Sequence, residues 1–284
     1  MWSAKNGQMD SRQEQEVRTY RKRDAIIPIC IVVFASFARL PLRPLLDALS
    51  IDFGAWPRTI EPVVFLMLPT IILLLLTKQN FASIGIHKKN LLPAMRLGLM
   101  FSLIPILGGL LPRILYGGDF VGFDLLAVLL VQVFIRAAAE DMLYTGYIQT
   151  RLYGLFKSDA AAIAVGAAVF SFTHLPGWLA GGRFDGVAHM IVMIVIWFIM
   201  HVVFAIIYRR YNSLIPVMIL HTAINFMNHQ HDIWTFAENH RASISGLVSL
   251  VTLITPLAIG VWAFIRYRKA KKATKANDSP TSQE

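Results

Sequence analysis

The chain has 284 residues, of which 56% are hydrophobic and 15% charged, and its mean hydropathy is +0.55. This composition is typical of a polytopic membrane protein and excludes a large water-soluble core. The formal net charge of +10 is compatible with nucleic-acid binding or with the positive-inside rule of membrane proteins, and the positions of the basic residues separate the two.

The basic residues gather on alternate segments between the apolar runs. About twenty of the 27 Lys and Arg lie on one set of segments, which includes both tails, and about six lie on the other set. No basic stretch has a folded domain or an aromatic platform beside it, so we expect membrane lipid as a partner and no nucleic acid. The single cysteine, Cys30, excludes an internal disulfide and a thiolate metal cluster.

The apolar runs predict an all-α integral membrane protein, a bundle of about eight transmembrane helices with an intramembrane polar site. In chain order the expected spans are 25–40, 61–77, 91–111, 120–153, 160–175, 187–208, 214–227 and 244–265. The expected divisions are a basic cytoplasmic tail (1–24), three N-terminal spans (25–117), a catalytic core with the last span (118–266) and a second basic tail (267–284). We expect a multi-pass protein of the cell membrane with both termini in the cytoplasm.

The fourth span, 120–153, carries Arg136, Glu140 and Asp141 in an otherwise apolar run. Each ionised residue at a bilayer centre costs about 2.5 to 3.5 kcal/mol, so these side chains must face a protein-lined or wet interior. Helical spacing lets Arg136 reach Glu140 one turn later. Asp141 lies about 100° further round the helix and needs another partner.

Folding the fourth and fifth spans into an antiparallel hairpin brings Glu140 level with His174, because each is seventeen residues from Lys157. An irregularity of one turn would break this agreement by about 5 Å. On the seventh span His221 and Asn225 are four residues apart and share one helical face. The sequence therefore offers a carboxylate, two imidazoles and an amide that can converge inside the bundle.

These side-chain types suit hydrolysis. A carboxylate and a histidine can hold and deprotonate a water molecule, while a second histidine and an amide donate hydrogen bonds to an oxyanion. Alternatively, Glu140, His174 and His221 could supply the ligands of a catalytic zinc ion, although the chain lacks a His-Glu-x-x-His motif. His189 and His201 lie about 120° apart on the wheel of the sixth span and do not form a pair, so neither is assigned to the site.

Three short motifs resemble those of the CPBP (ABI) intramembrane protease family, which includes the type II CAAX prenyl endopeptidase. The resemblance covers about residues 120–226. The matching residues are Glu140, Asp141 and Thr145 for the pattern Glu-Glu-x-x-x-Arg, Phe170 and His174 for Phe-x-x-x-His, and His221 and Asn225 for His-x-x-x-Asn.

The resemblance implies an eight-helix enzyme that cuts a peptide or protein substrate, lipidated or not, at or in the membrane. Glu140 with His174 would activate water, and His221 with Asn225 would stabilise the oxyanion. The family is often labelled as metalloproteases, and a metal-free glutamate mechanism has also been argued for it. We favour the metal-free mechanism and keep as the alternative a divalent metal such as zinc, held by Glu140, His174 and His221.

Two positions depart from the family pattern. Asp141 is shorter than the glutamate it replaces, and Thr145 removes an arginine. Our hypothesis is that Arg136, one turn before Glu140, supplies the missing positive charge, so Asp141 and Arg136 are assigned as supporting residues. Without that compensation the protein would be a non-catalytic relative, acting as a scaffold or a bacteriocin self-immunity protein. A third reading is an ion-coupled transporter that uses Arg136, Glu140 and Asp141 as a relay.

Overall fold

The structure is a computed structural model, which describes residues 22–48, 57–88, 91–156, 158–180 and 186–277. Five helical segments in this part of the chain are long and apolar enough to cross a membrane: Thr59–Leu76, Leu91–Tyr116, Asp159–Leu179, Val187–Tyr211 and Glu238–Trp262. The protein is therefore an all-α, multi-pass membrane protein, as the composition predicts. The expected number of about eight spans stays a prediction.

The N-terminal part is helical over longer stretches than expected. Its elements are α2 (Lys22–Ala48), α3 (Pro57–Pro62), the π-helix η2 (Val63–Met67), α4 (Leu68–Leu76), the 3-10 helix η3 (Phe81–Ile84) and α5 (Leu91–Tyr116). The first span was expected over about residues 25–40, and the helix that contains it, α2, continues to Ala48. Similarly, α5 continues past residue 111 and contains Pro105 and Pro112. In an apolar environment, a backbone N–H or C=O outside a helix has no water with which to form a hydrogen bond. Helices therefore tend to continue there.

The central part follows the predicted order. Its elements are β1 (Asp119–Phe120), α6 (Phe123–Asp141), the π-helix η4 (Met142–Ile148), α7 (Gln149–Leu155), α8 (Asp159–Ala180), α9 (Val187–Tyr211) and α10 (Ile215–Asn228). The fifth span was expected to end at residue 175, but α8 runs through Pro176 to Ala180. Seven residues within the predicted fourth span form η4.

The remaining elements are α11 (Gln230–Ile233), β2 (Trp234–Thr235), the 3-10 helix η5 (Glu238–His240) and α12 (Arg241–Asn277). The two short strands were not expected; they pair antiparallel, with Asp119 opposite Thr235 and Phe120 opposite Trp234. The last helix also runs further than the expected end at residue 265, so part of the predicted C-terminal tail is helical.

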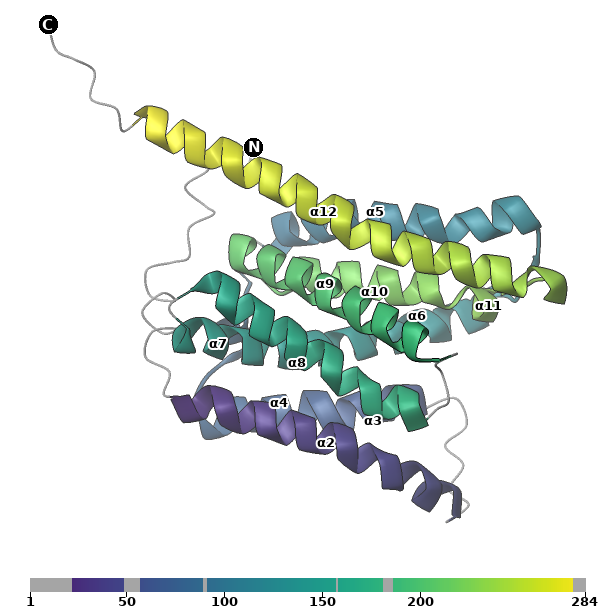
Figure 1. Ribbon diagram of the computed structural model, residues 1–284, viewed down its shortest axis with the longest axis horizontal. Helices are drawn as coiled ribbons and strands as arrows, with labels where there is room; N and C mark the ends of the chain where they lie inside the picture. The colour runs from purple at the N-terminus through teal and green to yellow at the C-terminus, as the bar shows by residue number, and fades with distance from the viewer. Residues whose placement is uncertain (1–21, 49–56, 89–90, 157, 181–185, 278–284) are drawn as a thin grey trace, which may run out of the picture.

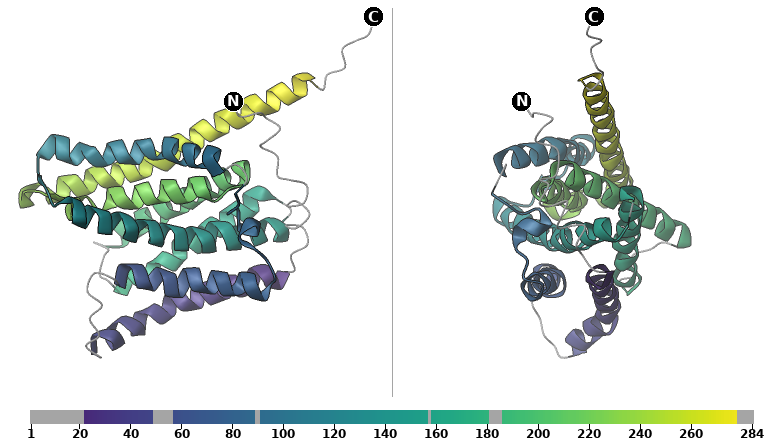
Figure 2. Two further views of the ribbon diagram at one scale, coloured as in Figure 1. Left: turned by 180° about the vertical axis from the view of Figure 1, so that it is seen from behind. Right: turned by 90° about the vertical axis from the view of Figure 1, so that its left-hand side faces the viewer.

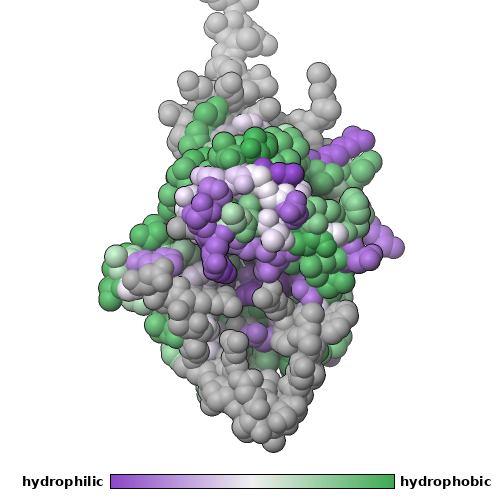
Figure 3. Space-filling view, turned by 90° about the vertical axis from the view of Figure 1, so that its right-hand side faces the viewer, coloured by the Kyte–Doolittle hydropathy of each residue, from purple (hydrophilic) through white to green (hydrophobic). Residues whose placement is uncertain are grey.

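The helices run back and forth and form layers (Figure 1). Helices α6, α8, α9 and α10 lie between α2 with α4 on one side and α5 with α12 on the other, and the views in Figure 2 agree. Close helix packing places α10 against α5: a Cβ added to Gly98 would lie 2.9 Å from Ile219 Cβ. Seen from the end at which α11 lies, polar residues gather on the end of the bundle and apolar residues form much of its rim (Figure 3). This distribution suits a bundle whose sides contact lipid.

Candidate active site

Glu140 lies at the buried end of α6. Three alanines precede it, Ala137, Ala138 and Ala139, and all three are buried, so neighbouring helices can approach this turn closely. Arg136 Nε donates a hydrogen bond to Glu140 Oε1 at 2.9 Å, which confirms that Arg136 reaches the carboxylate. The Glu140 side chain is 7% exposed and that of Arg136 is 44% exposed, so the arginine lies at the edge of the site.

His174 approaches the same carboxylate from α8. Its Nε2 lies 3.9 Å from Glu140 Oε2, which confirms that the hairpin brings the two residues level. The contact is made although the π-helix η4 lies between Glu140 and the end of α7, fifteen residues later, and His174 is fifteen residues after the start of α8. His174 Nδ1 lies 2.7 Å from the Phe170 carbonyl oxygen, which can only accept, so a neutral His174 ring carries its proton on Nδ1.

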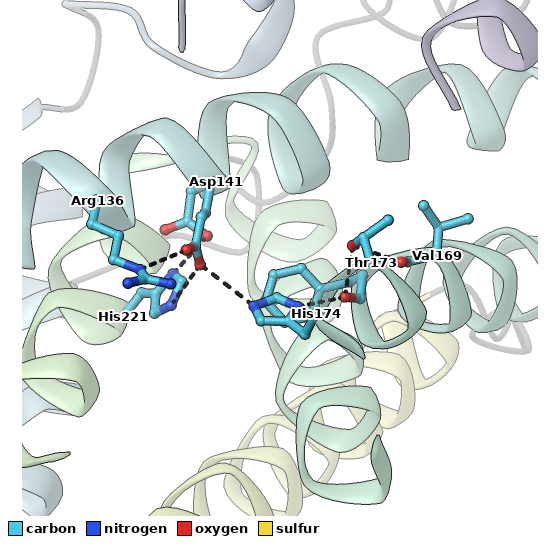
Figure 4. A network of polar contacts seen from close by, with 8 residues as sticks. Arg136, Asp141, Val169, Thr173, His174 and His221 are labelled. Carbon is cyan, nitrogen blue, oxygen red and sulfur yellow. Dashed lines mark hydrogen bonds and ion pairs between the residues drawn. The ribbon is translucent and has the colours of Figure 1, made fainter. Parts of the chain in front are cut away.

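His221 on α10 lies between two carboxylates. Its Nδ1 is 3.1 Å from Asp141 Oδ1 (Figure 4). Its Nε2 is 3.6 Å from Glu140 Oε2. Neighbouring residues of a helix point about 100° apart, so Glu140 and Asp141 can face different nitrogens of one ring. Asp141 thus has the partner outside its own helix that the helical wheel requires.

Asn225 and Thr145 make no polar contact with this group in the described part of the chain. Asn225 lies one turn after His221 on α10, and its Nδ2 is buried without a hydrogen-bond partner among the described residues. Thr145, at the family's arginine position, is buried in η4, and its Oγ1 likewise has no partner there. Arg136 is the cation that contacts Glu140, at the distance given above.

The same residues can be compared with the requirements of a metal site. His174 and His221 both direct Nε2 toward Glu140 Oε2, as the zinc alternative requires. However, no three His, Cys, Asp or Glu side chains of the described ranges form a group that could hold a metal ion. The Arg136 guanidinium also places a positive charge on Glu140 Oε1, which opposes a second cation beside the same carboxylate. The charge of Arg136 therefore disfavours a metal ion on this carboxylate.

His201, which the sequence did not assign to the site, lies beside it on α9. Its side chain is fully buried, and its ring stacks on that of Phe170 with 5.0 Å between centroids. The sequence pattern pairs His201 only with His189 of the same helix, and the two do not share a face. The neighbour that places His201 beside the site is Phe170, on α8. A polar residue inside a long apolar span was the available signal.

Comparison with known proteins identifies the segment that contains the site. Residues 122–227 match the family model described as "Type II CAAX prenyl endopeptidase Rce1-like". No match to the chain is found among curated proteins. The matched range runs from the beginning of α6 to the end of α10, and it contains all six assigned site residues: Arg136, Glu140, Asp141, His174, His221 and Asn225. The family implies peptidase activity and a peptide or protein substrate in a membrane context. Residues 122–227, less than half of the chain, are therefore similar to the Rce1-like family of type II CAAX prenyl endopeptidases.

Proposed function

We propose that the protein is an intramembrane endopeptidase that hydrolyses peptide bonds of membrane-associated proteins or peptides. The observation that carries this proposal is the convergence of Glu140, His174 and His221 from three different helices of an apolar bundle. Ionisable residues inside membrane spans are energetically expensive and mark functional sites by default. The family of the matched segment supports peptide hydrolysis rather than transport.

Glu140 is the general base in this proposal. Its Oε2 is separated from the two histidine Nε2 atoms by 3.9 and 3.6 Å. These separations are too long for direct hydrogen bonds, but one water molecule can contact the atoms on both sides. His174 donates a hydrogen bond from its Nδ1–H to the Phe170 carbonyl, so its unprotonated Nε2 can accept a hydrogen bond from that water and orient it.

The reaction then consumes one water for each peptide bond. Glu140 takes a proton from the water, and the water oxygen forms a bond to the carbonyl carbon of the substrate. The carbonyl oxygen becomes an oxyanion. When this intermediate collapses, the carbon–nitrogen bond breaks and Glu140 returns its proton to the leaving amine.

His221 and Asn225 are proposed to stabilise the oxyanion. Arg136 neutralises one of the two carboxylates, and a proton on His221, which lies between Asp141 and Glu140, would balance the other. A protonated His221 has an Nε2–H that can donate to the oxyanion, and the buried Nδ2 of Asn225 is a second donor. This charge balance supports the metal-free mechanism.

Cleavage is tested by comparing peptide termini in membranes from cells that express the wild-type protein or Glu140→Gln at matched folded levels. Glutamine keeps the shape of the side chain but cannot take a proton from water. New termini that vanish with Glu140→Gln are expected. Asp159→Asn is the matched control. It removes a carboxylate at the start of α8, the end away from His174, where Asp159 pairs with Arg209 of α9. Termini that persist in Glu140→Gln would overturn the mechanism.

The substrate that we propose is membrane-associated, and the family suggests a prenylated CAAX-type terminus. We also propose the cell membrane as the location, with both termini in the cytoplasm. The beginning of α2 and the end of α12 lie toward the same end of the bundle, which supports a common side for the two termini (Figure 1). A farnesylated peptide and its unmodified counterpart, compared as substrates, test the role of the lipid.

Thr145 favours a second candidate function, that of a non-catalytic relative acting as a scaffold or self-immunity protein. The family's arginine is absent from this position, and the hydroxyl that replaces it has no partner in the described residues. In that case the peptide termini are identical in wild-type and Glu140→Gln membranes, and the cellular phenotype survives the substitution.

A further inference from the structure

Helices α8 and α9 contact each other through a ladder of four rings. Phe170 and His174 are one turn apart on α8, and Trp197 and His201 are one turn apart on α9. His174 stacks on Trp197 with centroids 4.8 Å apart and planes 28° apart, and Phe170 stacks on His201 at 5.0 Å and 26°. We call these four residues the ring ladder. It fixes the face of α8 that carries His174.

The ring ladder is connected to the helical segment that carries Glu140. His201 Nε2 lies 3.3 Å from Gln149 Oε1, and both side chains are fully buried. Gln149 begins α7, which continues from Glu140 through η4. The ladder therefore touches both sides of the Glu140–His174 pair, through stacking on α8 and through Gln149 on α7.

Gly166 provides the space for this connection. It lies one turn before Phe170 on α8, and a Cβ there would overlap Gln149 Oε1 and lie 3.2 Å from His201 Nε2. The fit is therefore specific to glycine. Any side chain at position 166 would force the Gln149 amide away from His201.

Hydrogen bonds do not account for every polar atom that is buried at the His201–Gln149 contact. Among the described residues, His201 Nδ1 has no hydrogen-bond partner. Burying such a group costs free energy unless it is paired, and an apolar side chain of similar size would avoid that cost. This cost indicates that the position of the His201 side chain matters more than its contribution to stability.

The geometry points to Trp197, His201 and Gln149 as positioning residues that set the orientation of the His174 ring relative to Glu140. The Phe170 carbonyl fixes the His174 proton on Nδ1, Trp197 covers one face of the His174 ring, and His201 supports the Phe170 ring. Gln149 then ties this stack to the helix of the carboxylate. This assignment rests on the proposed hydrolase function, and its test has one readout that needs no activity.

The kinetic test uses Gly166→Ala, which adds one methyl group and removes no functional atom. Misplacement of a catalytic group by about 1 Å can cost about 100-fold in rate, so we expect kcat to fall about 10- to 100-fold with KM unchanged. Gly177→Ala on the same helix is the matched control, because a Cβ there meets nothing within 4 Å, and we expect wild-type kinetics. Both variants are compared at equal folded fraction in detergent.

A double variant separates positioning from general damage. Gln149→Ala alone should lower kcat to a similar extent, and Gly166→Ala should have no further effect in that background, because the shortened side chain leaves room for the methyl group. Multiplicative losses in the double variant would overturn the assignment. If Gly166→Ala does not fold, Trp197→Leu against Trp197→Phe gives the same comparison, with the aromatic variant expected to retain kcat better.

The readout without activity is the ring ¹⁵N spectrum of histidine-labelled protein, with His174 assigned by His174→Gln. We expect the His174 signals to move in Gly166→Ala and Trp197→Leu and to stay in place in Gly177→Ala. Unmoved signals would overturn the assignment. Moved signals in a protein that cleaves nothing would refute the hydrolase function and leave the ring ladder as the structure that orients His174.

Discussion

Asp141 Oδ1 on α6 and His221 Nδ1 on α10 lie 3.1 Å apart, and both side chains are 1% exposed. Glu140, the preceding residue, faces the other nitrogen of the same imidazole. Two consecutive carboxylates thus hold one ring from two sides. The aspartate that departs from the family pattern has a defined partner, so its shorter side chain does not leave an isolated buried charge.

We expect Asp141→Ala to lower the free energy of unfolding by about 3 kcal/mol, because removing one partner of a buried pair leaves the other uncompensated. Asp141→Asn keeps the shape and should retain more stability, but it should lower kcat because His221 loses a charged acceptor. Unfolding in detergent micelles and peptide cleavage measure the two effects. Asp159→Asn, at the ion pair with Arg209, is the control, and equal losses in both asparagine variants would contradict the prediction.

Arg136→Gln should reduce kcat by about tenfold or more, since a hydrogen bond to a charged group contributes about 1.5 to 3 kcal/mol. Arg136→Lys keeps the charge and should retain part of the activity. Cleavage rates at equal protein levels check the expectation. Unchanged folding and unchanged activity in Arg136→Gln would show that Arg136 does not replace the family's missing arginine.

Thr145→Arg restores the family residue, but we expect it to destabilise the protein by roughly 3 kcal/mol, because position 145 is fully buried and Arg136 already pairs with Glu140. The double variant Arg136→Gln/Thr145→Arg should recover part of the loss. Thr145→Val is the control: it keeps the shape and removes a hydroxyl without a partner, so it should be neutral or stabilising. Thermal melting compares the three, and a stable Thr145→Arg would refute the expectation.

Treatment with 1,10-phenanthroline should leave cleavage unchanged if the metal-free mechanism holds, because Arg136 and the proton on His221 supply the charge balance. Metal analysis of the purified protein should then find no stoichiometric zinc. Inhibition that added zinc reverses would instead establish the alternative in which Glu140, His174 and His221 hold the metal.

Several features of the site follow from local spacing and were predictable. Arg136 and Glu140 are one helical turn apart, so their contact depends on a single helix. Glu140 and His174 were expected to meet because equal numbers of residues separate them from Lys157, and the contact is present although one of the two helical arms contains η4. The membrane class and most helix positions follow from apolar runs, since a chain in lipid must satisfy its backbone hydrogen bonds internally.

Only the tertiary structure decided which helices share the site and how each is rotated. The sequence determined that Asp141 needs a partner, but the packing of α10 against α6 selected His221. It also determined that His201 is a polar residue in an apolar span, but the ring ladder and Gln149 became visible only with α7, α8 and α9 in place. Helical periodicity is local and can be read from one segment, whereas the rotation of one helix against another depends on the shapes of all the side chains packed between them.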